Sequence, residues 1–317
     1  MKQVLFFFIL CSITLQSQNF NKVDNLVSQY PKFTKIEDLT NQIEKDFTSD
    51  ENKARAAFYW LAKNIRYNLK EYYNPKQRSY QFKYSSEEEK ISKLQAIKDK
   101  LVSTTFKTKT GVCEEYAQSF KKICDLLGLE AAVISGYVRN SPKEIGRPKK
   151  YSNHAWNAVK LNNKWLILDA TWAAGHLING KWIRKFNNYF YNMPKDKIFK
   201  THYPEDSLWV LRFGSISKEE FYNQPIYDAS LLSSKAELLT STTGILKVNA
   251  SKEIILKFKN LENSSLIRYA FRGDRYSTKP TISFAENTYT LTIKNAKQNS
   301  FLTLYLDQSA ILQFQTN

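Results

Sequence analysis

Histidine and cysteine are scarce in this sequence. Its 317 residues include three histidines and three cysteines, and no two cysteines form a Cys-x-x-Cys pair. Structural zinc sites need four such side chains at short, regular spacings. We therefore expect no metal site and no cofactor.

Acidic residues are also outnumbered: 30 Asp and Glu stand against 47 Lys and Arg, a formal net charge of +17. The lysines are scattered along the chain, and no helix-turn-helix, zinc-finger or RNA-recognition pattern accompanies them. A basic surface attracts polyanions in general. We expect a solvated lysine-rich surface, with an anionic cell-envelope polymer as an additional partner and no specific nucleic acid.

Long apolar runs are absent. The most marked one covers residues 4–15, follows a lysine and ends just before a serine at position 17. That length suits a signal peptide and falls short of the roughly 20 residues of a membrane helix. We predict that residues 1–18 are a signal peptide and that the protein is exported to the periplasm, the cell envelope or the medium. Cys11 raises the question of lipidation, but the bulky Leu10 before it disfavours that reading.

Removal of that segment leaves only Cys113 and Cys124. On one helix they would lie about 16 Å apart at 1.5 Å per residue, whereas a disulfide needs Cα atoms within about 7 Å. We expect two free thiols. An exported protein that keeps an unpaired cysteine usually has a use for it, and we assign that use to Cys113 and a core position to Cys124.

Cys113 stands where an amphipathic helix is predicted to begin. Apolar residues then recur at helical spacing until a glycine closes the pattern, at Phe120, Ile123, Leu127 and Gly128. The unpaired N–H groups and the positive dipole end of a helix start favour a thiolate over a thiol.

His154 and Asp169 are predicted to lie near each other on a β-hairpin. One strand-like run starts at His154, the next ends at Asp169, and Asn162-Asn163 between them signals a two-residue turn. With residue 161 opposite residue 164, counting outward places Asp169 opposite residue 156. Asp169 is then one diagonal step from His154, about 5–8 Å away.

Cysteine, histidine and aspartate form the set that a thiol acyl-transfer enzyme needs. Imidazole takes the thiol proton near neutral pH, and a carboxylate behind its other nitrogen fixes the tautomer. The Cys113 backbone N–H is one candidate donor to the oxyanion. The second donor is left open among four residues, which are Trp60, Asn64, Tyr67 and Gln118.

Each of these residues taken singly also has a structural explanation. A helix cysteine is usually core filler, a strand histidine is usually structural, and an aspartate at a strand end is ordinary. The joint arrangement of all three is what favours catalysis. We interpret the remaining histidines, His176 and His202, as structural or surface residues.

Four blocks of sequence resemble the transglutaminase-like superfamily, especially its microbial and kyphoscoliosis-peptidase-like branch. They are GVCEEYA (111–117), SGY (135–137), NHAWNAV (153–159) and WLILDATW (165–172). The likeness extends over roughly residues 35–225. It implies a papain-like α+β domain with Cys113 as nucleophile, His154 as base and acid, and Asp169 as the orienting carboxylate.

The sequence departs from that pattern at Glu115, where glycine is more usual. A glutamate there would crowd the mouth of the site and shape substrate choice. We assign four residues to substrate binding: Glu115, Tyr116, Trp156 and Trp172.

The chain is predicted to have three parts: the signal peptide (1–18), a catalytic domain (19–230) and an Ig-like accessory β-sandwich (231–317). Before Cys113 we expect a loosely packed lead-in (19–35), a loop (104–110) and helices over residues 36–47, 52–65 and 85–102. After the hairpin we expect extended aromatic-rich chain over 170–230, with one short helix at 218–222. Six short alternating runs then indicate the sandwich, at 245–248, 253–258, 266–271, 281–284, 289–293 and 301–305.

The resulting hypothesis is an enzyme that forms a thioester from a peptide or protein amide. Water resolves the thioester in a peptidase, and an amine resolves it in a transglutaminase. We favour hydrolysis, because water is always available and no dedicated amine site is evident. The alternative from a different class is a catalytically idle binding or scaffold protein that keeps the fold.

Overall fold

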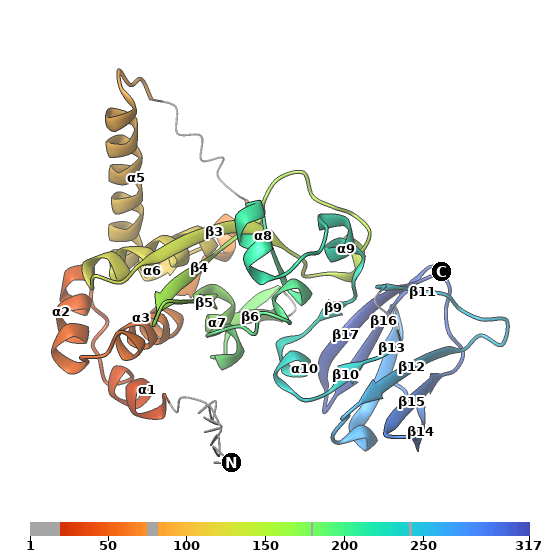
Figure 1. The fold of residues 1–317 in the computed structure, drawn as a ribbon. Coiled ribbons are helices and arrows are strands. Elements are labelled where there is room, and N and C mark those ends of the chain that lie inside the picture. The colour runs from red at the N-terminus through yellow and green to blue at the C-terminus, as the bar shows by residue number, and fades with distance from the viewer. Residues whose placement is uncertain (1–19, 75–81, 179, 241–242) are drawn as a thin grey trace, which may run out of the picture.

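The computed structural model describes residues 20–74, 82–178, 180–240 and 243–317 (Figure 1). The predicted signal peptide, residues 1–18 including Cys11, lies outside these ranges. Within them, a domain of mixed helix and sheet precedes a β-sandwich, which confirms the predicted α+β fold class. No helix in the described part of the chain is long and apolar enough to cross a membrane.

Three helices open the first domain: α1 (Asn21–Val27), α2 (Ile36–Asp46) and α3 (Asp50–Asn64). The helices α2 and α3 were predicted, but α1 corrects the expected loose lead-in. Asp24 of α1 accepts hydrogen bonds from Nε and Nη2 of Arg55 at 2.8 and 2.6 Å. Val23 and Val27 are buried. This long-range ion pair holds α1 on α3, and local sequence periodicity does not reveal it.

Helix α5 (Glu87–Thr108) is longer than predicted and takes in most of the expected 104–110 loop. The threonines that suggested a loop bond within the helix instead. Their hydroxyls donate to carbonyls four residues earlier, from Thr104, Thr105 and Thr108. In Figure 1 the helix projects from the body of the domain, and its buried residues all lie near its C-terminal end.

A four-stranded sheet of order β5-β4-β3-β8 forms the centre of the domain. Its strands are β3 (Ala131–Val138), β4 (His154–Leu161), β5 (Lys164–Leu168) and β8 (His202–Pro204), and α6 (Cys113–Leu126) packs on β3 and β4. The predicted hairpin register is confirmed, with Leu161 paired to Lys164. The turn residues Asn162 and Asn163 have φ of 48° and 58°, as a type I′ turn requires.

Residues 170–230 form short regular elements rather than the predicted extended chain. They are α7 (Ala170–Ala174), β6 (Gly175–Ile178), β7 (Lys181–Arg184), α8 (Ser207–Phe213), α9 (Lys218–Asn223), β9 (Ile226–Tyr227), α10 (Ala229–Ser233) and the 3₁₀ turns η2 (Asn188–Phe190) and η3 (Ile198–Lys200). Only α9 was predicted. Helices of five to seven residues show too few turns for apolar periodicity to register.

The C-terminal part is a sandwich of two sheets, β10-β12-β15-β14 and β11-β17-β16-β13. Its strands are β10 (Glu237–Leu238), β11 (Ile245–Leu246), β12 (Ile254–Lys259), β13 (Ile267–Phe271), β14 (Thr281–Ala285), β15 (Thr288–Ile293), β16 (Ser300–Leu306) and β17 (Ser309–Thr316), with a 3₁₀ turn η4 (Ser264–Leu266). The predicted runs all correspond to strands. β17 was missed because its turn, Asp307-Gln308, lacks the usual Asn or Gly, although both residues have positive φ.

The two parts have separate hydrophobic cores but are joined by polar contacts. Within the first part, the buried guanidinium of Arg139 donates to the carbonyls of Gln224 and Pro225, directly before β9, at 2.5 and 3.2 Å. The Gln315 amide of β17 donates to Pro142 in the 3₁₀ turn η1 (Pro142–Glu144) at 2.8 Å. β9 pairs with β17. The predicted domain boundary at residue 230 stays a prediction.

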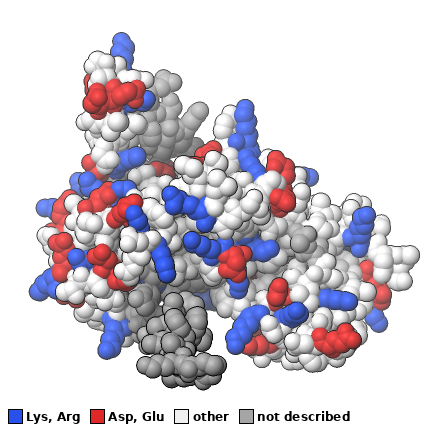
Figure 2. Space-filling view, viewed as in Figure 1, with Lys and Arg blue, Asp and Glu red and all other residues white. Residues whose placement is uncertain are grey.

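Charged side chains are mixed over the face shown in Figure 2. Lys and Arg are interspersed with Asp and Glu on both parts of the chain. This view fits the expected solvated basic surface, and the predicted polyanion partner stays a prediction.

Candidate active site

A short two-stranded sheet directly before Cys113 positions this residue at the start of α6. β1 (Arg66–Tyr67) pairs in parallel with β2 (Thr110–Gly111), directly before the cysteine. A short helix, α4 (Leu69–Tyr73), follows β1 in the sequence. Cys113 is partly exposed and unpaired, whereas Cys124 is buried, and burial raises the pKa of the Cys124 thiol. Cys113 is thus the one of these two thiols that a substrate can reach.

The Glu115 side chain folds back toward Gly111 and Val112 instead of reaching outward. Its carboxylate accepts a hydrogen bond from the Val112 backbone N–H at 3.0 Å, and the residue is only 6 % exposed. A Cβ at Gly111 would lie 2.5 Å from the Glu115 Cβ, so glycine is required where this side chain crosses. Glu115 therefore orders the turn that presents Cys113, a role that differs from the predicted contact with substrate.

His154 and Asp169 meet as the hairpin register predicted. His154 begins β4, Asp169 follows β5, and Nε2 of the histidine lies 2.7 Å from Oδ2 of the aspartate. His154 is 7 % exposed and Asp169 is fully buried. Cys113 also acts to raise the pKa of His154, which requires its side chain to lie close to that ring. Since Asp169 engages Nε2, Nδ1 is the ring atom left for the thiol.

The charges of this pair stabilise each other. Burial acts to lower the pKa of His154, but the charge and hydrogen bond of Asp169, with a contribution from Cys113, outweigh it and raise that pKa. Burial acts to raise the pKa of Asp169, but His154 and, less strongly, His202 hold it well below its usual range. The pair therefore favours an imidazolium beside an ionised carboxylate.

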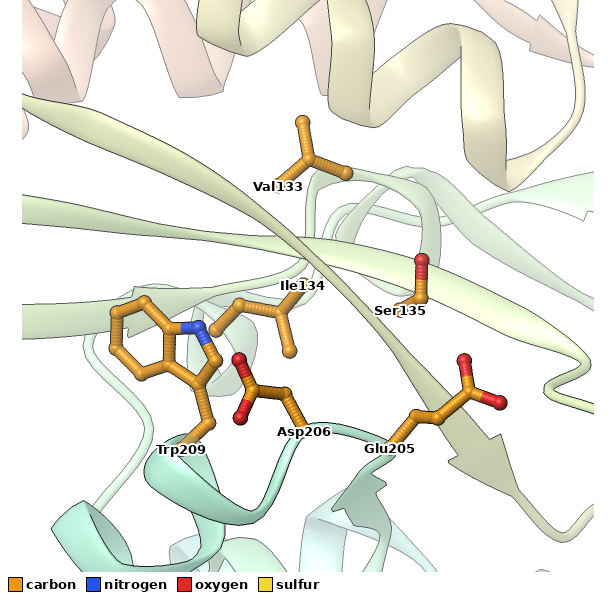
Figure 3. A pocket seen from close by; sticks show the side chains of 6 residues that line it. All are labelled: Val133, Ile134, Ser135, Glu205, Asp206 and Trp209. Atoms are coloured by element: carbon orange, nitrogen blue, oxygen red, sulfur yellow. The ribbon is translucent and has the colours of Figure 1, made fainter.

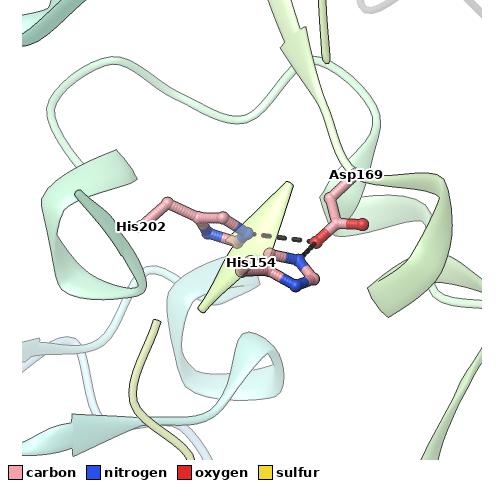
Figure 4. A group of neighbouring side chains, drawn as sticks. All are labelled: His154, Asp169 and His202. Atoms are coloured by element: carbon pink, nitrogen blue, oxygen red, sulfur yellow. Dashed lines mark hydrogen bonds and ion pairs between the residues drawn. The ribbon is translucent and has the colours of Figure 1, made fainter. Parts of the chain in front are cut away.

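His202 also contacts the site, whereas we predicted a structural or surface role for it. Figure 4 shows its ring and that of His154 directed at the same carboxylate, with His202 Nε2 3.1 Å from Oδ2 of Asp169. His202 is fully buried on β8. The sequence signal that could have identified His202 is its position in a His-Tyr-Pro segment (202–204) that follows the four motif blocks. His176, by contrast, is exposed on β6.

Two of the predicted substrate-binding residues lie in the core. Tyr116 is 1 % exposed and donates its hydroxyl to the Ile65 carbonyl at 2.6 Å. Trp156 is also 1 % exposed and stacks on His154. Their burial does not fit contact with a substrate. Trp172 is partly exposed, with its ring 5.7 Å from that of His154, so its predicted role remains open.

The four candidates for the second oxyanion donor differ in how many of their donor hydrogens already have an acceptor. The single indole N–H of Trp60 already donates to Pro31, whereas Asn64 and Gln118 each use one of their two amide protons, toward Trp60 and Glu114. The fourth candidate is Tyr67 on β1. Burial first, then the charges of Cys113 and other neighbours, raise its pKa, so its phenol stays protonated and able to donate.

His154, Asp169 and His202 also form a set that could hold a metal ion, since their ligand atoms lie within 4.8 Å of one another. In this arrangement, however, both imidazole Nε2 atoms are at hydrogen-bond distance from one carboxylate oxygen. A metal at about 2.0–2.2 Å from each ligand would need to displace those hydrogen bonds. The expected absence of a metal stays a prediction.

A surface hollow of about 290 Å³ lies elsewhere, between β3 and the start of α8 (Figure 3). It is lined by Val133, Ile134, Ser135, Glu205, Asp206 and Trp209. None of Cys113, His154 and Asp169 lines it, so the hollow is separate from the reactive groups.

The fold and this geometry define an α+β domain in which a helix-start cysteine is combined with a buried histidine–aspartate pair. Residues 80–170 match the family described as the transglutaminase-like superfamily. The predicted resemblance to this superfamily is therefore confirmed over these residues.

Several known proteins are similar to this chain. Over 254 residues the chain is 25 % identical to human kyphoscoliosis peptidase and covers 78 % of itself and 35 % of that protein. It is 30 % identical over 128 residues to hillarin of Drosophila melanogaster, covering 35 % of this chain and 15 % of hillarin. The chain thus spans about a third of the length of the kyphoscoliosis peptidases that it matches. A solved TGase structure aligns with 56 % of this chain and 37 % of its own at a TM-score of 0.30 and 18 % identity.

Proposed function

We propose that this protein is an exported cysteine enzyme that cleaves peptide or protein amides through a thioester on Cys113. The observation that carries the proposal is the meeting of three groups at one point. Cys113 offers a partly exposed thiol at a helix start and acts on the pKa of His154, whose Nε2 is held by the buried Asp169.

In the first step, Nδ1 of His154 holds the proton of Cys113, and the thiolate Sγ attacks the amide carbon. The carbonyl oxygen takes up the negative charge and is stabilised by the Cys113 backbone N–H and by the Tyr67 hydroxyl, the candidate second donor that we favour. His154 then protonates the amine nitrogen, the C–N bond breaks, and the acyl group remains on sulfur as a thioester.

In the second step, water attacks the thioester carbon and His154 accepts its proton. The C–S bond breaks, releasing a carboxylic acid and restoring the Cys113–His154 pair. An amine in place of water would give a new amide by the same steps. We retain hydrolysis as the proposed outcome, because none of the described residues marks an amine-binding site.

Export rests on the apolar segment within residues 1–18, and N-terminal sequencing of the secreted protein tests it. A second, weaker partner follows from the net charge of +17. An anionic polymer such as dextran sulfate would then bind in a salt-dependent way, equally well to the protein and to its Cys113→Ala variant.

The reaction is tested with a mixture of unfolded casein peptides, with and without biotin-cadaverine. The proposal predicts new peptide amino termini that depend on Cys113 and disappear in Cys113→Ala. Biotin on the peptides would replace hydrolysis by transamidation. Absence of both products, together with a Cys113 that iodoacetamide labels no faster than an ordinary thiol, would leave the idle scaffold as the better account.

A further inference from the structure

His202 reaches the site from the strand on the other edge of β3, on the same face of the sheet as His154. It lies on β8, which pairs with β3 through Val138, while His154 lies on β4 on the other edge of β3. Its ring is fully buried and enclosed by aromatic side chains at centroid distances of 4.8 to 6.3 Å, from Trp172, Trp156 and Phe190. A histidine in such a place must satisfy both ring nitrogens within the protein.

The hydrogen bonds around Asp169 determine how His202 is protonated. Oδ1 of the carboxylate accepts the backbone N–H groups of Thr171 and Trp172, at 2.8 and 3.0 Å. Oδ2 faces Nε2 of both histidines, at 2.7 and 3.1 Å. A carboxylate offers about four acceptor sites, so all of them are filled only if both histidines carry a proton on Nε2.

The other nitrogen of His202 has a matching partner. Nδ1 lies 2.8 Å from the Thr201 hydroxyl, whose single proton has a more distant alternative acceptor in the Ile198 carbonyl at 3.4 Å, so the shorter contact favours donation to Nδ1. A neutral ring with its proton on Nε2 satisfies Thr201 and Asp169 together. Burial, reinforced by the nearby charge of His154 and opposed by Asp169, lowers the pKa of His202. The neutral form is therefore favoured near pH 7.

We propose that His202 is a positioning residue, a neutral imidazole whose Nε2–H holds Oδ2 of Asp169 in place for His154. This inference rests on the proposed function, because it concerns how Asp169 orients the base. With His202 in place, the carboxylate cannot rotate or take up a proton without leaving a buried donor unpaired. The catalytic proton is thereby confined to His154 and Cys113.

The first test is the tautomer of His202 in the unaltered protein. Uniformly ¹⁵N-labelled protein has only three histidine rings to assign, and ¹⁵N shifts distinguish Nε2–H, Nδ1–H and imidazolium forms. The proposal expects a neutral Nε2–H ring for His202 near pH 7. A protonated ring, or one with its proton on Nδ1, would overturn it. This readout needs no substrate, so it is independent of whether the protein cleaves amides.

The second test compares His202→Gln, which keeps an N–H donor, with His202→Met, which fills similar space without one. The readout is the rate at which iodoacetamide alkylates Cys113 near pH 6. We expect His202→Met to slow this rate about 10-fold or more and His202→Gln to restore it to within about 3-fold, as for other supporting hydrogen bonds. Thermal unfolding of both variants shows how much stability each loses.

Thr201→Val serves as a milder matched variant, because it removes the partner of Nδ1 and leaves the imidazole itself unchanged. We expect the His202 tautomer to become mixed and the alkylation rate to fall by less than in His202→Met. Equal rates in the Gln and Met variants, or a rate that follows thermal stability alone, would show that His202 has only a structural role. A wild-type Cys113 that reacts slowly would contradict the proposed function instead.

Discussion

Replacing Asp169 by asparagine should separate stability from reactivity. The Oδ1 position must stay an oxygen, because it accepts two backbone N–H groups. The new NH₂ group then takes the place of Oδ2 and faces Nε2 of His154 and His202. Its two protons can satisfy both rings, provided that each histidine moves its own proton to Nδ1.

That rearrangement preserves the number of hydrogen bonds to residue 169 but reverses the direction of the two that involve the histidines. Charged hydrogen bonds are replaced by neutral ones at about 1 kcal/mol each, so we expect a loss of about 1–3 kcal/mol in the free energy of unfolding. Asp169→Ala leaves four buried donors without a partner and should cost about 3–5 kcal/mol. The contrast between the two variants follows from the geometry of one carboxylate.

Reactivity should fall far more than stability. A proton on Nδ1 of His154 faces Cys113, so the ring can no longer accept the thiol proton. An ordinary thiol with a pKa of about 8.5 is only about 0.3 % ionised at pH 6. Loss of the base should therefore slow alkylation by about 10- to 100-fold, and turnover by about 10³- to 10⁴-fold as with other wrong-tautomer bases.

The assay combines thermal unfolding, alkylation of Cys113 followed by peptide mass spectrometry, and the ¹⁵N tautomer of His154. Cys113→Ala gives the background reaction. The reasoning is refuted if Asp169→Asn keeps the wild-type alkylation rate, or if its His154 retains the Nε2–H tautomer.

Four further changes test other parts of the account. Asp24→Ala leaves the buried Arg55 guanidinium unpaired and should cost about 3–5 kcal/mol in chemical denaturation; a loss below about 1 kcal/mol would show that α1 contributes little. Cys124→Ala removes a small buried side chain and should cost about 1 kcal/mol with no change in Cys113 alkylation. The folded pKa of Asp169 lies below the unfolded value of about 3.9, so the difference in melting temperature between wild type and Asp169→Asn should persist above pH 4 and shrink as the pH falls further. Prior treatment with EDTA should leave the Cys113 alkylation rate unchanged, and an altered rate would show that His154, Asp169 and His202 hold a metal.

The parts of the site that the sequence predicted are those set by local rules. The helix start at Cys113 follows from apolar spacing, and the contact between His154 and Asp169 follows from a two-asparagine turn that fixes the hairpin register. Period-two alternation likewise located most strands of the sandwich. In each case the decisive residues lie within about 16 positions of one another.

The parts that were missed depend on long-range packing. His202 reaches Asp169 from 33 positions away through pairing of β8 with β3, which no local pattern shows. Helix α1 is held by Arg55, 31 positions from Asp24. Tyr116 and Trp156 were assigned to substrate binding, yet in the fold both rings belong to the hydrophobic core.

The most direct measurement is the rate of Cys113 alkylation near pH 6 in the wild-type protein and in His154→Ala, with free N-acetylcysteine as the reference for an ordinary thiol. The account predicts that wild-type Cys113 reacts about 10- to 100-fold faster than an ordinary thiol and that His154→Ala abolishes the advantage. If Cys113 reacts like an ordinary thiol in both proteins, the Cys113–His154 pair is not an activated nucleophile and the proposed enzyme is contradicted.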